Sequence, residues 1–205
     1  NMDSMGDLRR THYADEVTTK LIGSELILAG NIAKSRDLGG VVFADLRDTS
    51  GIVQLSFGDG TPKDVFEKAA GLRAEYVVVA KGVLQQRESV NKNIPTGEVE
   101  LFVSDLRVLS EAETPPFEIR DDLNVKDELR LRYRYLDLRR EELHHAIAMR
   151  SVITRHVRDY YLDNRFVEIE TPVLIKSTPE GARDYLVPSR VQPGRFYCLP
   201  QSPQL

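Results

Sequence analysis

The sequence predicts an α+β chain that begins with a five-stranded β-barrel and continues into a second, helix-led segment. Five runs with strand composition are separated by turn signals such as Asp48-Thr49-Ser50-Gly51, and they cover residues 26–32, 41–46, 52–57, 76–83 and 99–108. A run with helical composition, 64–72, lies between the third and the fourth. Residues 141–164 carry apolar side chains at the spacing of a long helix. Five strands with a helix in that place is the order of an OB-fold barrel, with another small β-barrel as the alternative.

Size and composition favour a globular protein without a membrane segment. The chain has 205 residues, 41% of them hydrophobic and 29% charged, which suits one or two domains. No run approaches the ~20 apolar residues that span a bilayer, so a cytoplasmic protein is expected. The single cysteine, Cys198, excludes an internal disulfide and a multi-cysteine zinc site. His144 and His145 would point about 100° apart on a helix, so no metal site is predicted.

An RNA partner would have to bind a local face of the barrel, because the net charge of -4 and the pI near 5.7 argue against general nucleic-acid binding. OB-folds bind oligonucleotides on the outer face of their second and third strands. Strand alternation predicts that Val53, Leu55 and Phe57 form core and that Gln54 faces outwards. Phe43 likewise falls on the outer face of the second strand. Phe43 and Gln54 are therefore candidates for base contacts, and alternation is equally compatible with an ordinary packed aromatic at Phe43.

The composition changes after the barrel. Residues 1–112 are expected to form the barrel domain, and residues 113–126, which contain Pro115-Pro116 and a dense set of acids, a stiff linker. Residues 127–205 are the second predicted domain. Its start contains RLRYRYLDLRR, in which tyrosines and leucines interleave with arginines. A charge run is usually a solvated face, but these apolar residues require part of the segment to be buried.

Three strings in the second domain resemble class II aminoacyl-tRNA synthetases of the aspartyl, asparaginyl and lysyl subgroup, and most closely the bacterial aspartyl enzymes: YRYLDLRR, RFVEIETPVL and STPEGARDYLVPSRVQPGRFYCLPQSPQL. The resemblance implies the truncated start of an antiparallel α/β catalytic domain, in which a long helix leads to a strand that ends at Pro172. It also implies that Glu180 binds the ammonium group of the substrate aspartate, with Gln204 hydrogen-bonding the substrate and Ser202 supporting the pocket. It assigns no catalytic or metal-binding residue within this chain.

The barrel string SRDLGGVVFADLRDTSGIVQLSF resembles the anticodon-binding domain of the same enzymes. The resemblance implies that the anticodon loop contacts Arg36, Phe43, Gln54, Arg87, Asn91 and Glu100. Two departures from the family pattern stand out. Ser56 occupies a position where the family has an aromatic residue. Where family members carry a Trp and a run of arginines, this chain has Asn31, Lys34 and Ser35. Because each stacked base contributes roughly 1–3 kcal/mol, these departures predict weakened RNA binding. Leu38 is typical of family members restricted to aspartate tRNA.

The implied function is that of an ATP-dependent ligase that joins L-aspartate to its tRNA through aspartyl-adenylate. The implied ligands are tRNA(Asp), L-aspartate and ATP with Mg²⁺. ATP and Mg²⁺ are expected to be bound mostly by residues outside this chain. A second copy is the implied protein partner, in a homodimer formed through residues 141–174. The chain is expected to be an N-terminal fragment, inactive by itself. Two alternatives stay open: a non-catalytic OB-fold RNA-binding module, and an asparaginyl- or lysyl-tRNA synthetase relative.

Overall fold

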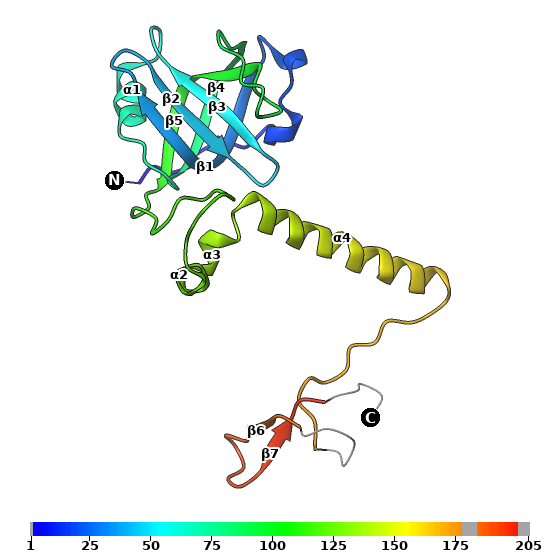
Figure 1. Cartoon of the computed structure of the whole chain (residues 1–205). Coiled ribbons are helices and arrows are strands. Elements are labelled where there is room, and N and C mark those ends of the chain that lie inside the picture. Colours follow the sequence, from blue (N-terminus) through cyan, green and yellow to red (C-terminus); the bar gives the residue numbers. More distant parts are fainter. Residues whose placement is uncertain (1, 178–183, 201–205) are drawn as a thin grey trace. The chain divides into compact units, whose positions relative to one another are not determined.

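The computed structural model describes residues 2–177 and 184–200, and the chain divides into two compact units, residues 1–143 and 144–205 (Figure 1). The first unit contains a closed β-barrel and two short helices. The second contains most of a long helix and a small hairpin. Within the described ranges, no helix has both the length and the apolar character needed to cross a membrane.

The barrel is built from five strands and one helix: β1 (Glu25–Asp37), β2 (Val42–Arg47), β3 (Ile52–Phe57), α1 (Lys63–Ala70), β4 (Val77–Gln86) and β5 (Val99–Ser110). Around the barrel the strands follow the order β1-β2-β3-β5-β4, and β4 pairs with β1 to close it. Only the β3–β5 pair is parallel among these neighbours. This order, with α1 between β3 and β4, confirms the predicted OB-fold. Two 3-10 turns, η1 (Ala14–Glu16) and η2 (Thr19–Leu21), precede β1.

Strand β1 is longer than predicted because it pairs with two neighbours in succession. Residues 25–31 pair with β4, and residues 31–37 pair with β2. The register shifts between Ile32 and Lys34, which marks an irregularity of the kind that bends a strand from one neighbour to the next. The polar run after Ile32 shows no apolar alternation, so composition alone ended the predicted strand too early.

The core of the barrel consists of the inward positions of the five strands together with α1. Val53, Leu55 and Phe57 are buried, as alternation predicts. Helix α1 adds Val65 and Ala69, which lie one turn apart on the same side of the helix. Because inward and outward positions alternate along each strand, this core also determines which side chains reach the outer surface.

Gly82 is required by a close backbone approach between β4 and β5. A Cβ at this position would lie 2.0 Å from the carbonyl oxygen of Phe102, beside a register shift between Lys81 and Gly82. We expect Gly82→Ala to lower the free energy of unfolding by about 2 kcal/mol, because the strands would have to move apart. Gly40→Ala is the matched control, since a Cβ there meets nothing within 4 Å. Urea denaturation of both variants tests this, and equal stabilities would contradict it.

The first unit ends in two short helices, α2 (Asp127–Arg132) and α3 (Arg134–Asp137). Asp137 is completely buried and accepts hydrogen bonds from Arg130 Nε, at 3.1 Å, and from Arg140 Nη1, at 3.4 Å. Hydrogen bonding to Asp137 raises the pKa of Arg130 above its usual value. Several arginines of the charge run therefore hold the segment together rather than pointing only into solvent.

The second unit begins within α4 (Glu141–Asp163) and also contains the hairpin of β6 (Leu186–Pro188) and β7 (Phe196–Cys198). Helix α4 matches the long helix predicted from apolar spacing. The structure differs from the prediction at the strand that was expected to end at Pro172. Residues 167–171 form no strand, and no described residue forms a β-ladder with them. An extended segment needs a neighbouring strand for its backbone hydrogen bonds, and here the first such contact is the bridge between Ile175 and Cys198.

Candidate nucleic-acid interface

The strand register brings four of the six predicted anticodon contacts onto one outer face of the barrel. Paired residues on neighbouring strands point to the same side of a sheet. One row includes Arg36, Phe43, Ser56 and Phe102 on β1, β2, β3 and β5, and it continues to Val83 on β4. A second row includes Asp45, Gln54, Glu100 and Gln85 on β2, β3, β5 and β4, and it continues to Lys34 on β1. Together these two rows form the outer face.

Phe43 and Arg36 supply an accessible aromatic ring and an accessible cation to the outer face. Arg36 is exposed, and Phe43 is half-buried between the buried residues Val42 and Ala44 of β2. Lys34 lies two residues before Arg36 on β1 and is exposed as well. A ring on which a base can stack and cations that can meet a phosphate are the two elements of a single-strand binding groove.

A hydrogen-bonded trio of side chains forms the second row. Gln54 Nε2 donates to Glu100 Oε2 over 2.6 Å, and Gln85 Nε2 donates to Glu100 Oε1 over 2.9 Å. Gln54 is only 4% exposed and Glu100 8%, although both point away from the barrel core. A buried carboxylate needs hydrogen-bond donors, and the two amides provide them. Glu100 therefore fixes the orientation of both glutamine side chains.

The remaining two predicted contacts, Arg87 and Asn91, lie in the loop that joins β4 to β5. The backbone N–H of Arg87 donates to the carbonyl of Glu98 at 2.9 Å, and that of Asn91 donates to the carbonyl of Gly97 at 2.9 Å. The loop is thus closed on itself beside the end of the second row, where Gln86 pairs with Val99.

Leu38, which the resemblance links to tRNA choice, is exposed in the turn between β1 and β2. Its backbone N–H donates to the carbonyl of Val41 at 3.0 Å, so the turn is closed while the side chain extends into solvent. The side chain is therefore accessible to a ligand.

The predicted aspartate site cannot be placed, because Glu180, Ser202 and Gln204 lie outside the described residues. Asp184, next to this segment, is half-buried and accepts a hydrogen bond from Ser177 Oγ at 2.8 Å. Burial, and then the nearby Asp184, raise the pKa of the Cys198 thiol.

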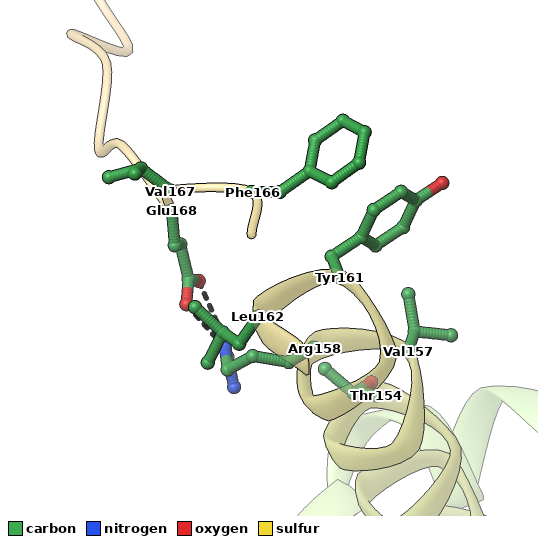
Figure 2. Close-up of a pocket in the computed structure, with 8 residues that line it drawn as sticks. All are labelled: Thr154, Val157, Arg158, Tyr161, Leu162, Phe166, Val167 and Glu168. Carbon is green, nitrogen blue, oxygen red and sulfur yellow. Dashed lines mark hydrogen bonds and ion pairs between the residues drawn. The ribbon is translucent and has the colours of Figure 1, made fainter. Parts of the chain in front are cut away.

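The second unit contains an apolar cleft of about 310 Å³ between the last turns of α4 and the chain that follows it (Figure 2). Tyr161 packs edge-on against Phe166, with ring centroids 5.1 Å apart. On the other side of the cleft, Arg158 Nε donates to Glu168 Oε2 over 2.7 Å and Nη2 donates to Oε1 over 2.8 Å. This bidentate pair lowers the pKa of Glu168 and raises that of Arg158. Sequence spacing predicted the helix but gave no signal for this pair.

Family models match both parts of the chain. Residues 26–109 match the OB-fold nucleic acid binding domain, and residues 126–205 match the class II tRNA synthetases (D, K and N). The chain is also similar to the crystal structure of asparaginyl-tRNA synthetase from Pyrococcus horikoshii complexed with asparaginyl-adenylate, with a TM-score of 0.79 and 26% identity, over 96% of this chain and 44% of that one. Both parts of the chain therefore match domains found in class II aminoacyl-tRNA synthetases.

Curated relatives specify the family further. The chain is 53% identical over 205 residues to the aspartate–tRNA(Asp/Asn) ligase of Halothermothrix orenii, covering 99% of this chain and 35% of the relative. It is 49% identical over 203 residues to the aspartate–tRNA ligase of Clostridium beijerinckii, covering 99% and 34%. Over 99% of its length the chain is thus similar to bacterial aspartate–tRNA ligases. It spans about a third of the length of these relatives.

Proposed function

We propose that this chain serves an ATP-dependent ligase that attaches L-aspartate to tRNA(Asp) for protein biosynthesis, and that its barrel reads the anticodon. The observation that carries the proposal is the 53% identity to an aspartate–tRNA(Asp/Asn) ligase over 205 residues. This likeness runs through both the barrel and the class II segment rather than through a single domain. It therefore favours the ligase over an isolated RNA-binding module.

Anticodon reading is assigned to the outer face and the loop beside it. Phe43 is the stacking ring, Arg36 meets the phosphate backbone, and Gln54 and Glu100 present oriented polar groups to base edges. Arg87 and Asn91 approach from the β4–β5 loop. A sequence-specific reader of single-stranded RNA needs this combination, because unstacked bases are recognised by stacking and by hydrogen bonds along their edges.

Phe43→Ala provides the test of the proposed function. We expect it to weaken binding of an aspartate-tRNA anticodon stem-loop by roughly 5- to 150-fold, because one base–aromatic stack contributes about 1–3 kcal/mol. The measurement is a fluorescence anisotropy titration at fixed low salt, since affinity for RNA depends strongly on salt. A stem-loop with replaced anticodon bases should bind the unaltered chain more weakly.

Tyr13→Ala is the matched control. Tyr13 is an aromatic residue of the same unit, its side chain is 45% exposed, and it lies outside the outer face. It should leave the affinity unchanged. If the unaltered chain binds both stem-loops equally well, or if the two alanine variants behave alike, the barrel does not read the anticodon through Phe43.

Aspartate binding is assigned to Glu180, Gln204 and Ser202 on the strength of their match to the family strings. An ammonium group is best held by a carboxylate, which Glu180 would supply. ATP and Mg²⁺ complete the reaction of class II synthetases. Within residues 2–177 and 184–200, no group of three or more His, Cys, Asp or Glu side chains could hold a metal ion.

A second copy of the chain is the proposed partner of residues 141–174, in a homodimer located in the cytoplasm. Apolar side chains of α4 are unusually accessible: Ile153 is 56% exposed, Val157 51% and Tyr161 50%. They recur every four residues and so line one side of the helix. Contiguous exposed apolar surface of this kind marks an interaction site.

A further inference from the structure

Phe102 is a second aromatic residue in the row that contains Phe43. Register pairs Phe43 with Ser56 and Ser56 with Phe102, so the small Ser56 on β3 lies between two rings carried by β2 and β5. Ser56 is the position where the family resemblance leads one to expect an aromatic side chain. The ring that β3 lacks is therefore present on the neighbouring strand.

The surroundings of Phe102 show that its ring belongs to the outer surface. Its neighbours Leu101 and Val103 are buried in the barrel core, whereas Phe102 is half-buried. A Cβ added to Gly60 would lie 3.8 Å from Phe102 Cζ, so the tip of the ring rests beside the loop after β3. This loop residue has no side chain that could cover the ring.

We propose that Phe102 stacks on a base of the bound anticodon loop and forms, together with Phe43, a two-ring platform that spans Ser56. This inference rests on the proposed anticodon-binding function. It assigns to Phe102 the stacking area that Ser56 cannot supply. The partner is single-stranded RNA, because stacking requires bases that have been freed from a duplex.

The spacing of the strands suits this role. Phe43 and Phe102 are separated by two strand spacings, about 10 Å at the backbone, with only a serine between them. Neither ring forms an aromatic pair or a cation–π contact with another described residue. Their accessible surfaces are therefore available to a ligand, and stacking on such rings tolerates any base because every base has a π-face.

Two substitutions at Phe102 separate stacking from packing. Phe102→Leu keeps an apolar side chain but removes the π-system, and we expect it to lower the affinity for the aspartate stem-loop by roughly 5- to 150-fold. Phe102→Tyr keeps the ring and should bind within about twofold of the unaltered chain, since stacking is retained. Tyr13→Leu is the matched control for loss of an exposed ring. If circular dichroism shows that Phe102→Leu does not fold, Phe102→Met is used in its place.

Stem-loops that each lack one anticodon base identify the stacked position. The penalty of Phe102→Leu should disappear with one of these abasic stem-loops and persist with the others. This readout would not change if Phe102 only supported the fold of the barrel.

The outcomes separate this inference from the proposed function. If Phe43→Ala weakens binding as expected while Phe102→Leu does not, or if leucine and tyrosine at position 102 are equally damaging, Phe102 has no stacking role. A penalty that survives removal of every anticodon base overturns the inference as well. Lack of preference for the aspartate anticodon in the unaltered chain would instead remove the proposed function.

Discussion

Glu75→Ala is expected to lower the free energy of unfolding of the first unit by about 3 kcal/mol, because it leaves a largely buried arginine without its partner. The Glu75 side chain is 5% exposed, and its carboxylate accepts hydrogen bonds from Arg47 Nη2 at 2.6 and 2.8 Å. Arg139, just after α3, donates to the same carboxylate. Urea denaturation followed by circular dichroism measures the loss.

Two further variants at Glu75 divide this loss into its causes. Glu75 has a φ of 66°, which an alanine tolerates less well than a glycine. Glu75→Gly should therefore be less destabilising than Glu75→Ala by about 1 kcal/mol. Glu75→Gln keeps the shape and removes the charge, so it isolates the ion pairs. The exposed Glu98 is the matched control, and if Glu98→Ala costs as much as Glu75→Ala, the buried ion pairs are not the reason.

Glu75 also links the barrel to the segment YRYLDLRR, because its carboxylate accepts a hydrogen bond from Arg139. Its backbone is held as well, since its N–H donates to the carbonyl of Ile32 at 2.7 Å. The strained backbone and the two arginines together hold the carboxylate between β2 and the end of α3. This contact explains in physical terms why an arginine follows the apolar residues of YRYLDLRR.

The barrel could be predicted from sequence because its information is local. The strand runs alternate with period two, and the buried residues Val53, Leu55 and Phe57 lie where the alternation puts them. The extension of β1 could not be predicted, since it depends on pairing with β2 rather than on its own composition. The strand before Pro172 was expected from resemblance, and it is absent because the described residues offer it no neighbour.

The candidate site was predictable as a set of residues but not as an arrangement. Gln54 and Glu100 are 46 residues apart, and only the parallel register of β3 and β5 brings them together. Alternation predicted an outward Gln54, yet burial and the bond to Glu100 depend on neighbouring strands. The φ of Glu75 and its arginine partners have no sequence signature, because glycine is the residue expected at a positive φ.

Val157→Glu is expected to convert a dimer of this chain into a monomer. Val157 is 51% exposed and lies on the side of α4 that also carries Ile153 and Tyr161. In a twofold interface each substitution occurs twice, so two carboxylates would be desolvated near each other. Like charges placed together at an interface cost several kcal/mol, which raises the dissociation constant at least ~100-fold. Sedimentation velocity at micromolar concentrations distinguishes the two states.

Ala148→Glu adds the same charge to the same helix and is the matched control. It precedes Val157 by nine residues, which places it about 180° around the helix axis. Glutamate is also a good helix former, so neither substitution should unfold α4. The control should remain dimeric if the side of α4 with Ile153, Val157 and Tyr161 is the interface. A monomeric unaltered chain, or equal dissociation of both glutamate variants, would show that this side of α4 does not bind a second copy.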